Sequence, residues 1–125
     1  MEKKSHEISE AELEIMKVLW LAAKPVNAQE VCELLTNREW KYTTISTLLS
    51  RMVEKGAVTY EKKGKFYYYF PVIKEDEYKQ VQTKNLVSKL YGGSVKNLAV
   101  SLLKTNYMSA EDIEEIKKMF NLQEE

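Results

Sequence analysis

The sequence has little of the chemistry that most enzymes and metal sites need. It contains one cysteine, Cys32, and one histidine, His6, among its 125 residues. A single cysteine excludes an internal disulfide framework and a zinc-finger cage built from one chain. A single histidine in a polar N-terminal stretch argues against a histidine-based triad, and neither a glycine-rich phosphate loop nor a nucleophile elbow is present. We therefore expect a protein that is not an enzyme and that carries no cofactor or metal.

Long apolar runs and an excess of charge of one sign are also missing. The longest apolar run spans residues 18–23, well short of the ~20 residues that cross a bilayer. The first residues are polar, unlike an export signal, so we expect a soluble cytoplasmic protein without membrane insertion. Nineteen basic and nineteen acidic residues give zero net charge, and 44% of the chain is hydrophobic. This composition is typical of one globular domain, or of one small domain with an appendage.

Capping residues mark two helices near the start of the chain. Ser9 and Glu12 form a capping box ahead of an apolar face, which predicts a helix over residues 9–22. Asn27 and Glu30 form a second box and predict a second helix. Its expected buried side chains are Val31, Leu34 and Leu35, with Cys32 packed beside them as a small apolar group.

A third helix is predicted over residues 43–55, ended by Gly56 in the left-handed conformation. Its expected buried stripe is Ile45, Leu48, Leu49 and Met52. The opposite face carries Thr43, Thr44, Ser46, Thr47, Ser50 and Arg51. Hydroxyl side chains are poor helix formers, but their small size suits a helix that must approach another surface closely.

The hydrophobic period then changes to two, which predicts a β-hairpin over residues 57–71 with its turn at Lys63-Gly64. The tip is basic, with Lys62, Lys63 and Lys65 around the glycine. Alternation puts Phe66, Tyr68 and Phe70 on one face and Tyr67 and Tyr69 on the other, and one of these sets is expected to be exposed. Three helices followed by a hairpin is the order of a winged helix-turn-helix domain, which we assign to residues 1–73.

Residues 74–125 are predicted to be a helical dimerisation domain. Helices are expected over residues 75–91, over residues 94–104 and from Ser109 onward. These helices have little to bury against one another, so a second copy of the same segment is the natural partner. The expected interface residues are Tyr78, Val81, Leu86, Leu90, Leu98, Leu102, Ile113, Ile116 and Phe120. The fold class is therefore mainly α with a small β-hairpin.

The zero net charge hides an asymmetry that favours DNA binding. Between Arg38 and Lys65 the chain has an excess of four positive charges, whereas Ser109 to Glu125 has an excess of four negative charges. In a winged helix-turn-helix domain the second helix of the motif enters the major groove by its N-terminal residues. The predicted DNA contacts are Lys41, Tyr42, Thr43, Thr44, Ser46, Thr47, Ser50, Arg51, Lys62, Lys63, Lys65 and Tyr67.

Three side chains of this region have structural interpretations beside the functional one. Thr43 is interpreted either as a DNA contact or as a simple helix cap. Trp20 is expected in the core. Trp40 is expected to pack against the third helix rather than to stack on a base.

Several segments resemble the penicillinase and methicillin-resistance repressor family. Residues 8–16 (ISEAELEIM) resemble its first helix, residues 44–52 (TISTLLSRM) with Glu54-Lys55-Gly56 resemble its recognition helix, and residues 90–93 (LYGG) resemble a later segment. The similarity runs from about residue 8 to residue 122. It implies a homodimeric transcriptional repressor with one winged domain on each half of a palindromic operator, controlling an inducible operon that responds to β-lactams or stress.

The resemblance also implies a route of inactivation. In the antibiotic-responsive members a membrane sensor with a zinc-protease domain leads, indirectly, to cleavage of an Asn-Phe bond in the dimerisation segment. Aligned from Tyr91-Gly92-Gly93, that bond is Ser101–Leu102 here. The copper-responsive members carry a Cys-x-Cys pair near the C-terminus, which this chain lacks. A basic or polar residue early in the family's recognition helix is replaced by Thr43 and Ser46, so a different operator sequence is expected.

A second hypothesis belongs to another class. The hydroxyl-rich third helix could dock a protein instead of DNA, which would make the chain a winged-helix interaction module. The two hypotheses differ in the salt dependence of binding, because phosphate contacts predict a steep loss of affinity as salt rises. Under the first hypothesis the partners are double-stranded operator DNA and a second copy of the chain, with no small-molecule substrate.

Overall fold

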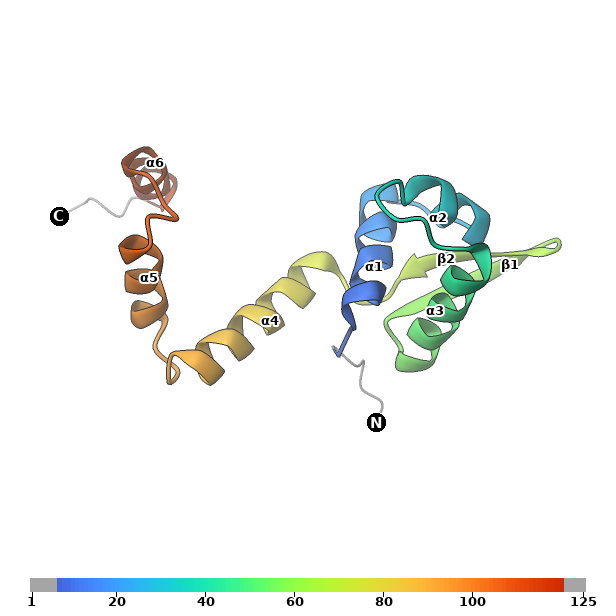
Figure 1. Ribbon diagram of the computed structural model, residues 1–125, viewed down its shortest axis with the longest axis horizontal. Helices are drawn as coiled ribbons and strands as arrows, with labels where there is room; N and C mark the ends of the chain where they lie inside the picture. Colours follow the sequence, from blue (N-terminus) through green and yellow to red (C-terminus); the bar gives the residue numbers. More distant parts are fainter. Residues whose placement is uncertain (1–6, 121–125) are drawn as a thin grey trace. The chain divides into compact units, whose positions relative to one another are not determined.

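The predicted winged helix-turn-helix fold is present in the computed structural model, which describes residues 7–120. Its elements are α1 (Glu10–Ala22), α2 (Ala28–Leu34), α3 (Tyr42–Lys55), β1 (Val58–Lys63), β2 (Phe66–Pro71), α4 (Glu75–Leu90), α5 (Val95–Lys104) and α6 (Ala110–Phe120) (Figure 1). The chain divides into two units, Met1–Val81 and Gln82–Glu125, so the division falls inside α4. His6, Glu124 and Glu125 lie outside the described residues. The fold class is the predicted one, mainly α with a two-stranded hairpin.

Both predicted capping boxes are confirmed. At α1 the Glu12 amide donates to Ser9 Oγ at 3.1 Å, and the Ser9 amide donates to Glu12 Oε1 at 2.9 Å. At α2 the Glu30 amide donates to Asn27 Oδ1 at 2.8 Å, and the Asn27 amide donates to Glu30 Oε1 at 2.9 Å. Each box satisfies amides that the first turn of a helix leaves without a partner, so both helices begin at the predicted residue.

The core of the first unit gathers the apolar stripes of α1, α2 and α3 against the base of the hairpin. Its largest fully buried apolar side chains are Ile15, Met16, Leu19, Val26, Val31, Ile45, Leu49, Met52, Val58 and Ile73. Each such side chain contributes roughly 1.5–3 kcal/mol by leaving water. Cys32 lies half-buried against this core as predicted, and burial raises the pKa of its thiol. The core fixes which sides of α3 remain exposed.

The prediction for Leu34 was wrong, because its side chain is 52% exposed. Helix α2 ends at Leu34, and Leu35 follows with the non-helical dihedral angles φ −88° and ψ 71°. This change of direction turns Leu35 into the core, where it is 4% exposed, and leaves Leu34 on the solvent side. The periodicity of the sequence does not reveal a helix that stops one residue before its last apolar position.

Trp20 lies at the edge of the core and is half-buried rather than fully buried. Its indole Nε1–H donates to the backbone carbonyl of Ile73 at 3.0 Å. Its ring packs on Tyr78 of α4, with the ring centroids 5.8 Å apart. These contacts hold the first turns of α4 to the winged unit, and they explain why this unit extends to Val81.

The hairpin is antiparallel, with partners running from Val58 with Pro71 to Lys63 with Phe66. Its two-residue loop is Gly64-Lys65, one residue later than predicted. Gly64 has φ 64°, and a glycine with positive φ at the first loop position is typical of a type II′ hairpin turn. At the other end, Val26 forms a bridge with Tyr69 through backbone hydrogen bonds of 2.7 and 3.0 Å. This bridge ties the hairpin to the loop between α1 and α2.

Exposure of the hairpin aromatics follows distance from the tip, so the expectation of one exposed face was wrong. Phe66 and Tyr67, at the tip end of β2, are 53% and 43% exposed although they lie on opposite faces. Tyr69 is 8% exposed and Phe70 is half-buried. The base of the hairpin packs on the helices, whereas its tip projects beyond them (Figure 1).

The helices of the second half of the chain bury almost none of their described residues. Of the described residues in α4, only Val87 is buried, and neither α5 nor α6 has a buried residue within the described range. Gly92 and Gly93, both with positive φ, separate α4 from α5. Ser94 caps α5, and Ser109 with Asp112 caps α6, which begins beside Ser109 as predicted. No helix between residues 7 and 120 has the length and apolar character needed to cross a membrane.

Candidate nucleic-acid interface

Helix α3 begins at Tyr42, one residue before the predicted start. Its N-cap residue is Lys41, whose side chain makes no capping hydrogen bond. Thr43 lies inside the first turn, so the interpretation of Thr43 as the helix cap was wrong. Its hydroxyl therefore lies on the exposed surface of the helix, where it can meet another molecule.

One exposed face of α3 carries the threonines. Thr43, Thr44 and Thr47 are exposed, and together with Leu48 and Arg51 they line a shallow hollow of about 280 Å³. Hydroxyls can donate to or accept from base edges, and threonine methyls can contact a thymine methyl. Arg51 lies one turn beyond Thr47 on this face, within reach of a phosphate group if the first turns of the helix enter a groove.

The other exposed side of α3 faces the hairpin across a groove of about 530 Å³. Tyr42, Ser46 and Ser50, spaced four residues apart, line one wall because such residues share a helix face. The rest of the lining is Asn27, Ala28, Gln29, Lys65, Phe66, Tyr67 and Tyr69. Burial raises the pKa of Tyr69, with smaller contributions from nearby tyrosines, so its hydroxyl is neutral at physiological pH. The groove therefore combines hydroxyls, amides and one lysine with the apolar surface of aromatic rings and Ala28.

Sequence reasoning missed Asn27, Ala28 and Gln29 as part of this groove. They lie far from α3 and the hairpin along the chain, and the backbone bridge between Val26 and Tyr69 brings them there. The only signal in the sequence was the capping box. It predicts that a helix begins at this point, but it does not predict which residues lie beside that helix in space.

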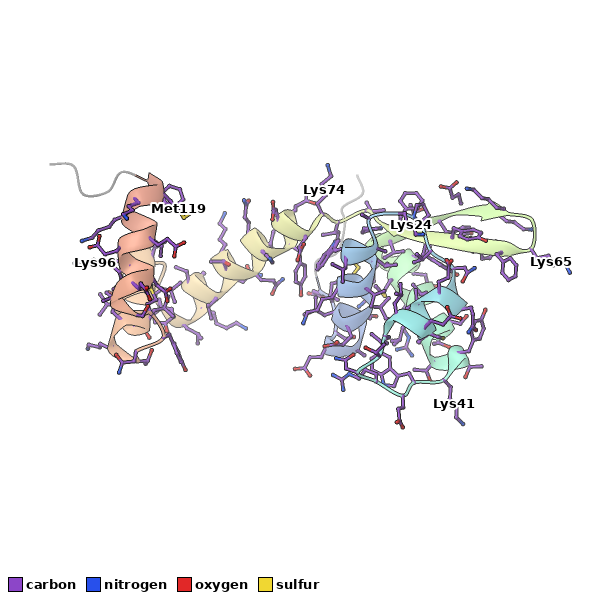
Figure 2. All side chains as sticks on the ribbon, turned by 90° about the horizontal axis from the view of Figure 1, so that it is seen from above. Lys24, Lys41, Lys65, Lys74, Lys96 and Met119 are labelled. Carbon is purple, nitrogen blue, oxygen red and sulfur yellow. The ribbon has the colours of Figure 1, made fainter. Side chains whose placement is uncertain are left out.

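The wing presents its lysines on a scaffold of aromatic rings. Lys62 Nζ lies 5.9 Å from the centroid of the Tyr67 ring, and Lys63 Nζ lies 5.8 Å from that of Tyr68. Tyr60 stacks on Tyr67 at 4.5 Å, which stiffens this strand pair. Lys65 is exposed and projects from the loop at the end of the hairpin (Figure 2). The three lysines are held where a duplex backbone could meet them.

Arg38 and Trp40 contact each other at the surface of the domain, beside α1. The Arg38 guanidinium lies 5.5 Å from the centre of the Trp40 ring and 3.8 Å from the Glu14 carboxylate. Trp40 is half-buried and packs against the core, and its packing against α3 in particular stays a prediction.

An ion pair between a buried carboxylate and a partly exposed ammonium group fixes the end of α3. Lys55 Nζ donates to Glu12 Oε1 at 2.5 Å and to the Glu7 carbonyl at 2.8 Å, and Glu12 is 2% exposed. Burial pushes the pKa of Glu12 upward, but hydrogen bonds from Lys55 and the Ser9 amide outweigh it and leave this pKa below its ordinary value of 4.5. The pair joins the start of α1 to the last turn of α3 and so helps to hold the orientation of the exposed faces.

The predicted interface residues of the second half do not form one buried cluster in a single protomer. Tyr78 belongs to the first unit, where its ring meets Trp20. Leu90 and Phe120 are each 64% exposed. The others are half-buried or exposed: Val81, Leu86, Leu98, Leu102, Ile113 and Ile116. The chain by itself leaves these apolar side chains incompletely covered.

Comparison with known proteins gives the family. The chain matches the penicillinase repressor family over residues 8–121. It is 36% identical over 115 residues to the penicillinase repressor of Bacillus licheniformis, covering 91% of this chain and 89% of that protein. It is 30% identical over 121 residues to the methicillin resistance regulatory protein MecI of Mammaliicoccus sciuri, covering 97% of this chain and 98% of that protein.

A solved structure is similar as well. It is the monomeric form of Bacillus licheniformis BlaI in complex with the blaP half-operator. Its TM-score is 0.50 at 40% identity, covering 62% of this chain and 93% of that chain. Taken with the winged helix-turn-helix fold and the exposed faces of α3, these matches place the chain in the penicillinase repressor family of DNA-binding transcriptional repressors, which are not enzymes.

Proposed function

We propose that the chain is a homodimeric repressor that binds a palindromic operator, with one winged unit on each half-site. The observation that carries this proposal is the pair of exposed hydroxyl-rich faces on α3 beside a wing with three lysines. The half-operator complex of the related BlaI supports the same use of a winged unit. The repressor would act in the cytoplasm, on an inducible operon that responds to β-lactams or to another stress.

Within this proposal the two faces of α3 have different tasks. The face with Thr43, Thr44 and Thr47 enters the major groove and reads base edges. The groove between α3 and the wing receives the sugar-phosphate backbone, with Ser46 and Ser50 as hydrogen-bond donors. Lys62, Lys63 and Lys65 neutralise phosphates at the wing. Because no arginine lies among the first residues of α3, sequence preference rests partly on hydroxyl contacts and on DNA shape.

The experiment is a fluorescence-anisotropy titration of the full chain against its own promoter DNA and against a scrambled duplex, at two salt concentrations. We expect tight binding to the promoter, weaker binding to the scrambled duplex, and loss of affinity for both as salt rises. Absent binding at low salt, or binding that ignores salt, would favour the alternative of a protein-interaction module.

Arg51→Ala is expected to weaken binding to both duplexes by a similar factor. If Arg51 holds one phosphate, its loss reduces the slope of log affinity against log salt by about one. Lys17→Ala is the matched control, because Lys17 is an exposed α1 residue outside both hollows of α3 and its loss changes the net charge equally. An unchanged slope for Arg51→Ala would remove Arg51 from the phosphate contacts.

The proposed dimer is supported by the exposed apolar surface of the second unit. Besides Leu90 and Phe120, the residues Val95, Leu103 and Met119 are 69%, 48% and 69% exposed. Helices of this length gain most of their stability by packing an apolar face, and α5 and α6 have no buried residue of their own in the described structure. A second copy would supply the missing surface without a further partner.

We further propose that induction inactivates the repressor by cleavage between Ser101 and Leu102, with a membrane sensor protease acting indirectly. This bond lies inside α5, where the Ser101 carbonyl accepts from the Thr105 amide at 3.1 Å. Ser101 Oγ also accepts from the Tyr91 hydroxyl at 3.1 Å. Proteases act on extended chains, so α5 must open locally before the cut, which makes a folded α5 slow to cleave.

Mass spectrometry of an N-terminally tagged repressor, purified from its own host before and after exposure to a β-lactam, tests this step. We expect a fragment ending at Ser101 only in the treated cells. A fragment ending elsewhere would contradict the proposed bond while leaving the DNA-binding proposal in place, and full-length protein alone would show that a β-lactam does not trigger the cut.

A further inference from the structure

A third concave surface of the winged unit shares no residue with the two hollows beside α3. It is a cleft of about 440 Å³ formed where the end of α1, the end of β2 and the start of α4 come together. Its lining residues are Leu19, Trp20, Ala23, Lys24, Pro25, Glu61, Phe70, Pro71, Lys74 and Glu75. None of them is a predicted DNA contact. We call it the Trp20 cleft.

The walls of the Trp20 cleft are apolar and held in place. Trp20 is fixed by its hydrogen bond to the Ile73 carbonyl at 3.0 Å and by its contact with Tyr78. Phe70 and Pro71 belong to β2, whose partner strand fixes their positions. Since the indole N–H is already used, this wall offers a ring face and no hydrogen-bond donor. The cleft is open to solvent, with an apolar wall and four charged residues at its edge, and its volume lies within the range of small-molecule sites.

The charges at the edge of the cleft favour an anion. Glu75 lies 3.4 Å from Lys79, and Glu61 lies 4.0 Å from Lys63, so both carboxylates have cationic neighbours. By contrast, the ammonium groups of Lys24 and Lys74 have no partner among residues 7–120 (both labelled in Figure 2). The two lysines are the charges still available to a ligand.

We propose that the Trp20 cleft binds a small organic anion with an apolar, ring-containing body. The body lies against Trp20, Phe70 and Pro71, and the carboxylate meets Lys24 and Lys74. The apolar wall supplies contact area and the lysines select the charge. This site shares no residue with the proposed DNA contacts, so its test does not depend on whether the chain binds an operator.

The test uses two probes that differ in charge alone, 1-naphthylacetate and its neutral amide, 1-naphthylacetamide. Each is titrated into the ¹⁵N-labelled full chain, and the indole N–H signals are followed by NMR. The chain has two tryptophans, and Trp40→Phe assigns the remaining signal to Trp20. For a ligand of this size we expect a dissociation constant of about 1 mM for the acid. The signal of Trp20 should shift and that of Trp40 should not.

Charge selection is tested with the double variant Lys24→Met, Lys74→Met, which keeps most of each apolar stem. We expect the dissociation constant of the acid to rise about three- to tenfold, to the value for the amide, which itself stays unchanged. Lys17→Met is the control and should bind both probes like the wild type. Equal affinity of the two probes for the wild type would overturn the assignment of an anion. An unshifted Trp20 signal throughout the millimolar range would overturn the site itself. An unaltered Trp40 signal in the double variant shows that it is folded.

Discussion

Leu90→Asp is expected to raise the dissociation constant of the dimer by at least about 100-fold, because an unpaired charge buried in an apolar interface costs several kcal/mol. Leu90 is the last residue of α4, and its side chain is 64% exposed in the single protomer. The protomer therefore loses almost no packing of its own when this side chain is replaced. In a symmetric dimer each copy carries the change, so the penalty applies twice.

Sedimentation velocity over a range of protein concentrations measures this effect. Ser88→Asp is the matched control, because it adds the same charge two residues earlier at an exposed polar position of α4. The control should remain dimeric where Leu90→Asp is monomeric, and both should keep the far-ultraviolet circular dichroism of the wild type. A fully dimeric Leu90→Asp would place the interface elsewhere on the second unit.

The same variant distinguishes binding to a full palindrome, which needs the dimer, from binding to a single half-site, which does not. Two half-site contacts joined in one dimer bind more tightly than one contact by about 10²–10⁴-fold, without any new contact. Leu90→Asp should thus lose most of its affinity for a full palindrome and keep the wild-type affinity for a single half-site. Cleavage within α5 would lower the affinity for the full palindrome in the same way. It removes part of the dimerisation segment and leaves the winged unit intact.

Signals between neighbouring residues in the sequence were sufficient to predict where the first three helices begin or end. Ser9 with Glu12 and Asn27 with Glu30 each place an acceptor and a carboxylate within four residues, so the helix starts depend on neighbours in the chain. Gly56, with φ 83°, ends α3 for the same local reason. The order of three helices and a hairpin then identified the winged helix and, with it, the exposed side of α3.

The remaining features depend on residues that are distant in the chain, and no periodicity encodes them. The bridge between Val26 and Tyr69 completes the groove beside α3, and it joins segments more than forty residues apart. The exposure of Phe66 and Tyr67 depends on how far the hairpin extends past the helices, which the alternation of strand residues does not determine. The ion pair of Glu12 and Lys55 also joins distant residues, and the sequence did not predict it. The capping box already explained why a glutamate stands at position 12.

Lys55→Met is expected to destabilise the winged unit by about 2 kcal/mol at neutral pH, because the buried Glu12 carboxylate loses a charged hydrogen-bond partner whose own side chain is partly exposed. Glu12 is 2% exposed and keeps only the Ser9 amide and hydroxyl as compensation once the ammonium group is removed. Methionine retains most of the apolar stem of Lys55, so the change in the free energy of unfolding reflects the loss of the charge more than a loss of packing. Lys17→Met is the control: its lysine lies 4.0 Å from Glu14 with a side chain 60% exposed, and it should cost less than about 0.5 kcal/mol. Urea unfolding followed by tryptophan fluorescence measures both variants, because Trp20 and Trp40 belong to the first unit.

The pH dependence distinguishes the ion pair from simple packing. The pKa of Glu12 is lowered in the folded wild type, so the stability that it contributes is fully present above 4.5, the ordinary pKa of a glutamate. That stability is lost as the pH falls through the folded-state pKa, where the carboxylate takes up a proton. In Lys55→Met the carboxylate is buried without its cation, and protonation relieves this penalty. The difference in stability between wild type and variant should therefore be largest at neutral pH and shrink on acidification. A difference that stays constant with pH would mean that Lys55 acts through its hydrocarbon stem, and that the orientation of α3 does not depend on this charge pair.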